Sequence, residues 1–202
     1  MQTNIIGLSG KRGSGKDTVA AIIQRLQPEK NWQILRFADK VKECTALLTG
    51  LPLELMHTQE GKRLYLHQYE MTVGQFQQKL GTEAIRGVMH DKAWIFATMC
   101  HVKPGGNYII PDVRFPNEVG CIEEAGGVVL RLNGDPLQQL GDGTRDDAHP
   151  SECALDGHPF TFPLDNTGSV GQLEEQVTKF LLVDLPVYFP SERLSIVPAT
   201  SW

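Results

Sequence analysis

The chain has 202 residues and a mass of 22.4 kDa, a size that favours a single domain. Apolar residues make up 41% of the sequence and charged residues 21%, a composition that is too apolar for a disordered protein. The net charge of −5 disfavours nucleic acid as a partner, although it permits a local basic patch that binds phosphates. The sequence has no apolar run of membrane-spanning length, no secretory leader and no CxxC pair among its four cysteines, so we expect a cytoplasmic protein with no membrane partner, zinc knuckle or disulfide framework.

Short apolar runs alternate along the chain with segments of helical periodicity, which is typical of a parallel α/β sheet. Apolar residues at intervals of three and four predict a helix over residues 15–27. Asp39 and Asp91 are expected to cap two later helices, and Pro111 is expected to end the third strand. The predicted strands are residues 4–8, 33–37, 107–110, 128–132 and 160–164.

Two further helix starts have the spacing of a capping box, in which a Ser or Thr and a Gln three residues later bond each other's backbone. These pairs are Thr72 with Gln75 and Ser169 with Gln172. Residues 50–71 are expected to be irregular or to form short helices.

A glycine-rich turn follows the first predicted strand and carries the strongest motif in the chain. Residues 10–18 read GKRGSGKDT, which contains the GxxxxGK pattern of a P-loop between a strand and a helix. Such a loop points backbone N–H groups at phosphate oxygens, and Lys16 adds a full positive charge. The residue after this lysine usually helps to hold Mg²⁺; here it is Asp17, with Thr18 next, so either side chain could serve the metal.

Other charged and aromatic residues follow the predicted strands, whose carboxyl ends should meet at one edge of the sheet. Asp112 is expected beside the P-loop, where its carboxylate could orient the shell of the Mg²⁺ ion, and Arg114 could pair with an anionic acceptor. Phe37 and Lys42 flank the end of the second strand and face the same cleft, and Arg86 could reach the acceptor phosphate.

Residues 133–158 are rich in Gly, Asp and Pro, and a loop of this length suits a lid. Arg145 lies within it and Arg131 precedes it; arginines on a closing flap suit phosphoryl transfer because they stabilise the charge of the migrating group. His149 and Glu152 have no third ligand at a suitable spacing, so we expect hydrogen bonds in the lid or hinge from them rather than metal binding.

Six segments occur in order along the chain: GLSGKRGSGKDT, RFADKVKE, QQKLGTEAIR, IIPDVRFPNEV, DDAHPSE and DNTGSVGQLEEQV. Together they resemble the deoxynucleoside monophosphate kinases of tailed bacteriophages over about residues 4–181. The resemblance implies an α/β P-loop kinase fold over residues 1–182, with an acceptor-binding helical region at about 38–106 and a lid at 133–158. Residues 183–202 form a tail without an assigned role, and a phage-encoded enzyme would work in the host cytoplasm.

The resemblance implies ATP and Mg²⁺ as cosubstrates and a deoxynucleoside monophosphate (dNMP) as the small-molecule acceptor, and a homodimer is compatible with it. The predicted catalytic residues are Lys16, Asp112, Arg114 and Arg145, and the predicted metal residues are Asp17, Thr18 and Asp112. The predicted ATP-binding residues are Gly10, Lys11, Gly13, Ser14, Gly15, Lys16, Asp17, Thr18 and Asn166, the last near the adenine. The predicted acceptor-binding residues are Phe37, Lys42, Arg86, Asp112 and Arg114; Lys40 departs from the proline of this family.

The main hypothesis is transfer of the γ-phosphoryl group of ATP to a dNMP, which needs no general base because the acceptor oxygen is already anionic. One alternative is a kinase of another phosphorylated acceptor, since GKR, SGKD and the DDAHPSE stretch are also similar to phosphomevalonate kinases of animal type. A second is a kinase of a hydroxyl, on a nucleoside or a hydroxymethylated base in DNA, for which Asp39 is the candidate base. A third is a non-enzymatic nucleotide-binding scaffold, which the cleft arginines disfavour.

Overall fold

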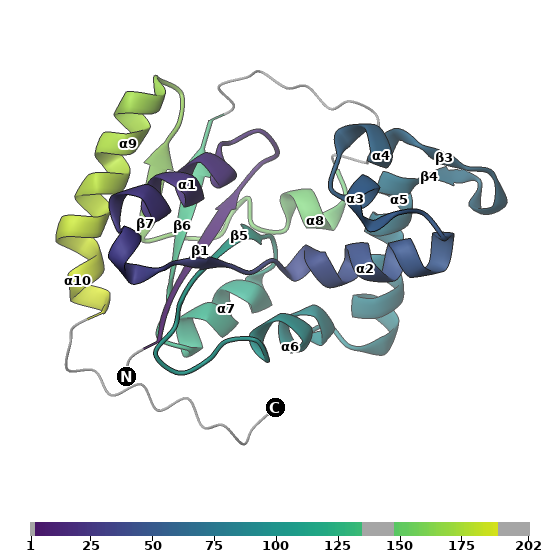
Figure 1. Cartoon of the computed structure of the whole chain (residues 1–202), viewed down its shortest axis with the longest axis horizontal. Coiled ribbons are helices and arrows are strands. Elements are labelled where there is room, and N and C mark those ends of the chain that lie inside the picture. The colour runs from purple at the N-terminus through teal and green to yellow at the C-terminus, as the bar shows by residue number, and fades with distance from the viewer. Residues whose placement is uncertain (1–2, 135–147, 190–202) are drawn as a thin grey trace.

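A five-stranded parallel sheet forms the centre of the chain in the computed structural model, which describes residues 3–134 and 148–189 (Figure 1). The strand order is β2-β5-β1-β6-β7, and each neighbouring pair is parallel. This confirms the predicted α/β class, and it brings the carboxyl ends of the strands to one edge. The strands are β1 (Asn4–Gly10), β2 (Gln33–Ile34), β5 (Asn107–Val113), β6 (Val128–Asn133) and β7 (Phe162–Asp165).

Helices cover both faces of the sheet because successive side chains of a strand point to opposite faces. Ile6 of β1 belongs to one buried cluster with Val19, whereas its neighbour Ile5 belongs to another with Ile122. The helices of the first cluster are α1 (Lys16–Leu26), α9 (Val170–Lys179), the π-helix η4 (Phe180–Asp184) and α10 (Leu185–Tyr188). Those of the second are α2 (Phe37–Thr49), α6 (Ala93–Met99) and α7 (Pro116–Glu124).

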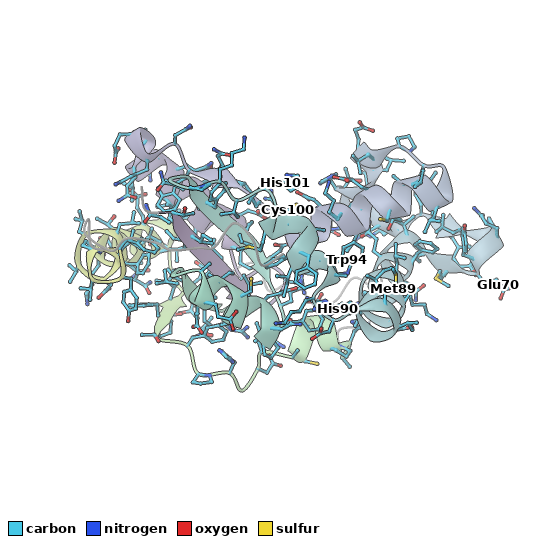
Figure 2. All side chains as sticks on the ribbon, turned by 90° about the horizontal axis from the view of Figure 1, so that it is seen from below. Glu70, Met89, His90, Trp94, Cys100 and His101 are labelled. Atoms are coloured by element: carbon cyan, nitrogen blue, oxygen red, sulfur yellow. The ribbon has the colours of Figure 1, made fainter. Side chains whose placement is uncertain are left out.

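The chain between α2 and α6 forms a helical region beside the sheet, with a small core of Met56, Leu66 and Val73. Figure 2 shows Glu70 at the far tip of this region and Trp94 nearer to the sheet. Its elements are α3 (Leu53–Met56), α4 (Gln59–Arg63), the antiparallel pair β3 (Tyr65–Leu66) and β4 (Met71–Thr72), the short helix η2 (His67–Tyr69), α5 (Val73–Gln78) and the π-helix η3 (Lys79–Met89). Both predicted capping boxes are confirmed, at the starts of α5 and α9.

The start of α2 differs from the prediction. The second strand was expected over residues 33–37, but β2 ends at Ile34, and Phe37 begins the helix with Arg36 as its N-cap residue. The capping carboxylate comes from Asp112 at the end of β5, whose two oxygens accept hydrogen bonds from the backbone N–H groups of Phe37 at 3.1 Å and Ala38 at 2.9 Å. The prediction of Asp39 as the cap is therefore wrong, because a partner distant in sequence satisfies the first N–H groups.

Two further local predictions are wrong for identifiable reasons. Pro111 does not end β5, because the register of β5 against β1 skips one residue between Gly7 and Ser9, and such a bulge accommodates the missing N–H of proline. Asp91 does not cap α6, whose N-cap residue is Lys92; the backbone carbonyl of Asp91 instead accepts a hydrogen bond from the Asn117 side chain at 3.2 Å.

The predicted lid and tail are described only in part. The described part of the lid segment contains the short helix α8 (Pro150–Cys153), and Arg145 lies outside the described residues. Helix continues past residue 182 to Tyr188, and Leu185 is buried in the first cluster.

A one-turn helix, η1 (Pro28–Lys30), leads into β2. Among the helices of the described segments, none is long and apolar enough to cross a membrane.

Close packing of α7 on β1 yields a stability prediction. A Cβ atom at Gly7 would lie 2.8 Å from Ile122 Cδ1 and 3.0 Å from Val129 Cγ2, whereas one at Gly120 on α7 would meet no atom within 4 Å. We expect Gly7→Ala to lower the free energy of unfolding by about 1–3 kcal/mol through overpacking. The matched change Gly120→Ala should raise it by about 0.5–1 kcal/mol. Urea denaturation measures both, and equal effects of the two changes would contradict the packing described here.

Candidate active site

The glycine-rich loop joins β1 to α1 and curls as a phosphate-binding loop must. Gly13 and Gly15 have φ values of 77° and 92°, a left-handed conformation that residues with a Cβ rarely adopt. The loop is closed by a hydrogen bond from the Ser14 N–H to the Lys11 carbonyl at 3.2 Å. Gly15 is the N-cap residue of α1, so the positive end of the helix dipole faces the loop.

The Lys16 side chain folds back across this loop. Its Nζ atom donates hydrogen bonds to the carbonyl oxygens of Gly10 at 2.8 Å and Lys11 at 2.7 Å, and to Ser14 Oγ at 3.3 Å. Burial of the ammonium group, together with the nearby charge of Arg114, lowers the pKa of Lys16 to about 8. The group therefore stays predominantly protonated at neutral pH, and an incoming phosphate would favour the charged form.

The other predicted nucleotide residues surround the loop. Asn166 is buried and donates a hydrogen bond from Nδ2 to the Ser14 carbonyl at 2.9 Å, so its amide braces the loop from the end of β7. Asp17 is exposed and forms an ion pair with Arg36 at 2.7 Å. Thr18 is also exposed, on the first turn of α1.

The residues beside the glycine-rich loop suit a Mg²⁺ ion that is held mainly by a nucleotide. Among the residues that the structure describes, no three His, Cys, Asp or Glu side chains cluster to form a metal cage. Mg²⁺ usually keeps several waters and takes one or two carboxylates together with substrate phosphates. The exposed oxygens of Asp17 and Thr18 beside the loop fit that donor set. Asp112 fits it less well, since both of its carboxylate oxygens accept hydrogen bonds from the start of α2.

Asp112 links the end of β5 to the first turn of α2. Burial raises the pKa of its carboxyl group, and the hydrogen bonds from Ala38 and Phe37 oppose that shift by stabilising the carboxylate. The carboxylate also lies close enough to Lys16 to act on its pKa. The first turn of α2 is thereby held next to the glycine-rich loop.

A pocket opens between α2, η3, α6 and the end of β5. Its empty space, with the open mouth included, is about 640 Å³. All five predicted acceptor-binding residues line it: Phe37, Lys42, Arg86, Asp112 and Arg114. The sequence did not predict the other residues that line the pocket, which are Ala38, Val41, Gln77, Gln78, Gly81, Thr82, Trp94, Phe115, Glu118 and Ser151.

All three predicted cations in this pocket already have partners, of which those of Lys42 come from α2 and the helical region. Lys42 donates a hydrogen bond to Asp39 at 3.0 Å and lies 3.3 Å from His57 Nδ1. Burial and the charge of Lys42 lower the pKa of His57, so a neutral imidazole can accept from the ammonium group. Lys42 is therefore fixed at the pocket wall by two groups of the helical region and α2.

Arg86 is held more tightly still. Its guanidinium group forms a buried ion pair with Glu118, donates to Asn117 at 3.3 Å, and stacks on the ring of Phe115 with its central carbon 4.1 Å from the centroid. Glu118 also accepts hydrogen bonds from the backbone N–H groups of Arg114 at 2.7 Å and Phe115 at 3.1 Å. This one carboxylate thus fixes the turn that carries Arg114.

The segment around α8 lies over the site and supplies acidic partners. Arg114 pairs with Glu152 at 2.6 Å and donates to the Ser151 carbonyl at 2.8 Å. Lys11 pairs with Asp156 at 2.5 Å, and Arg131 lies 3.4 Å from the same carboxylate. Of the two residues expected to form hydrogen bonds in the lid or hinge, His149 contacts Ser151 Oγ at 2.9 Å, whereas the Glu152 side chain forms the ion pair with Arg114. Asp156, like Arg36, had no motif that singled it out in the sequence, because its role depends on contacts between distant segments.

Comparison with known proteins gives one informative relative. No protein-family model matches the chain. A protein of Acanthamoeba polyphaga mimivirus named "Putative deoxynucleotide monophosphate kinase" is 30% identical over 169 residues, which span 75% of this chain and 81% of that protein.

The buried ion pair between Arg86 and Glu118 yields the next prediction. Both side chains are less than one-tenth exposed, at 8% and 4%, so removing one charge leaves the other buried without its counter-ion. We expect Glu118→Gln to lower the free energy of unfolding by about 3 kcal/mol. The control Glu123→Gln, on the exposed side of the same helix, should change it by less than about 0.5 kcal/mol. A Glu118→Gln variant as stable in urea as the unmodified chain would contradict this network.

Proposed function

Because the chain belongs to the deoxynucleotide monophosphate kinase-like family of this mimivirus relative, we propose that it transfers the γ-phosphoryl group of ATP to a dNMP, giving dNDP and ADP. The observation that supports the proposal is the juxtaposition of two anion-binding features. The phosphate-binding loop carries Lys16, and the adjoining pocket carries Arg114, whose charge acts directly on that lysine. Two phosphate-bearing molecules bound in these places would meet end to end.

The chain's own groups account for the positioning and charge stabilisation that phosphoryl transfer needs. The loop N–H groups and Lys16 would hold the β- and γ-phosphates of ATP, and Arg114 and Lys42 would hold the phosphate of the acceptor. Asp17 and Thr18 would hold Mg²⁺, which neutralises charge between the β- and γ-phosphates when bound. The acceptor oxygen is anionic at neutral pH, so no side chain has to remove a proton from it.

The acidic partners of the cations fit a site that is prepared for phosphates. Glu152 and Asp156 pair with Arg114 and Lys11. A phosphate offers the same cations a more highly charged partner, so bound nucleotides would compete with these carboxylates. The exposed pair of Lys11 and Asp156, with each side chain about half exposed at 48% and 49%, should exchange most easily.

Loss of the loop lysine tests whether the phosphate-binding loop carries the activity. Lys16→Ala should lower kcat on the order of 10³-fold, because the γ-phosphoryl group loses its fixed cation. The fold should survive, as circular dichroism would show, and the control Lys30→Ala, on the exposed turn η1, should leave kcat unchanged. Chromatographic detection of dNDP measures turnover with ATP and each dNMP, modified pyrimidines included, and release of ADP measures turnover with phosphomevalonate. Failure to form dNDP from any dNMP, or full turnover by Lys16→Ala, would contradict the proposal.

The ion pair of Asp39 separates a phosphate acceptor from a hydroxyl acceptor. Asp39 accepts a hydrogen bond from Lys42 at 3.0 Å, so its carboxylate already has a cationic partner. For a dNMP acceptor we expect Asp39→Asn to lower kcat by less than about tenfold, because no base is needed. Glu43→Gln, which removes an exposed ion pair with Lys40 on the same helix, is the control. Near-abolition of turnover by Asp39→Asn alone would favour a hydroxyl kinase.

A further inference from the structure

We propose that the amide of Gln77 recognises the base of the acceptor nucleotide and sets which dNMP is preferred. The inference rests on the proposed function and extends it to the part of the acceptor that does not react. It follows from the direction in which an acceptor nucleotide must lie in the pocket. It also follows from which polar groups of the pocket are not already engaged and could bind the base.

The charge in the pocket fixes the direction of the acceptor. Arg114 and Asp112 at the end of β5 are near enough to Lys16 to act on its pKa, so the acceptor phosphate belongs at that end. Away from that end, two helices contribute to the walls: Phe37 and Val41 come from α2, and Gln77 comes from α5. A nucleotide with its phosphate toward Lys16 therefore places its base between these helices.

Most polar groups of the pocket are engaged and cannot read a base edge. Arg86 and Glu118 bind each other, and Asp112 caps α2. The indole N–H of Trp94 donates to the Gly81 carbonyl at 2.8 Å, so Trp94 offers a base only its ring. Phe37 and Trp94 are buried and supply aromatic surface, which suits a planar base.

Gln77 differs from these groups. Its side chain lines the pocket and is buried, with the residue 8% exposed, yet within the described chain its amide makes one polar contact, from Nε2 to the thioether sulfur of Met56 at 3.5 Å. A thioether is a weak acceptor, and a buried amide that lacks strong partners is costly. The donor and acceptor of this amide match the paired donor and acceptor along the hydrogen-bonding edge of a nucleobase.

The chemistry of the bases gives a directional test. An amide both donates and accepts, whereas a carboxylate only accepts. Guanine presents two adjacent N–H donors at N1 and N2, while the single N–H donor of thymine lies between two carbonyl acceptors. Gln77→Glu should therefore favour dGMP over dTMP. The control is Gln59→Glu, the same chemical change on the exposed surface of α4 in the same helical region.

The experiment measures kcat/KM for dGMP and dTMP at saturating ATP, with equilibrium binding of each dNMP measured in parallel. We expect Gln77→Glu to raise the dGMP-to-dTMP ratio at least about tenfold, with KM for ATP unchanged, and Gln59→Glu to leave the ratio within about twofold. A ratio for Gln77→Glu that stays within twofold, or moves toward dTMP, overturns the inference.

Two additions keep the test decisive. If Gln77→Glu does not fold, the neutral variant Gln77→Met fills the same volume without hydrogen bonds; it should lower kcat/KM at least about tenfold for the dNMP that the unmodified chain prefers. An unchanged preference would again overturn the inference.

If the unmodified chain phosphorylates no dNMP, the proposed function fails, while a base preference in binding that depends on Gln77 would still support the inference. If binding shows no base preference that depends on Gln77, the inference is overturned as well.

Discussion

The Asp112 carboxylate is the contact on which the arrangement of the site depends. It sits at the end of β5, next to the phosphate-binding loop, and accepts the first two free N–H groups of α2. One side chain therefore joins the edge of the sheet to the helix that forms a wall of the pocket. Because α2 carries Phe37 and Lys42, this contact sets how far the pocket that they line lies from Lys16.

A second constraint is the concentration of positive charge at this edge. Lys11 and Lys16 of the glycine-rich loop meet Arg114 and Arg131 from two other segments at this edge, although the chain as a whole is acidic. Carboxylates from the α8 segment neutralise three of these four cations at the surface of the site. The charge that suits phosphate binding is thus stabilised by acids that a phosphate can replace, whereas the buried pair of Arg86 and Glu118 holds the pocket wall.

The sequence predicted the parts of the molecule that depend on local pattern. The strand, loop and helix around residues 4–26 and both capping boxes agree with the structure, and the five residues predicted to bind the acceptor line one pocket. The errors lie where distant segments decide the outcome: Asp112 replaces Asp39 as the cap of α2, and a bulge carries β5 through Pro111. Gln77 was missed for the same reason, since a lone glutamine has no motif and gains meaning only from its burial in the pocket.

The central claim is that two phosphate-bearing molecules meet end to end in one cleft. A dinucleoside pentaphosphate, in which five phosphates join an adenosine to a deoxynucleoside, would occupy both halves at once. Titration calorimetry should find one molecule bound per chain, about 100-fold more tightly than ATP or a dNMP alone, and binding that excludes both. Affinity no greater than that of ATP, with dNMP binding undisturbed, would contradict the account.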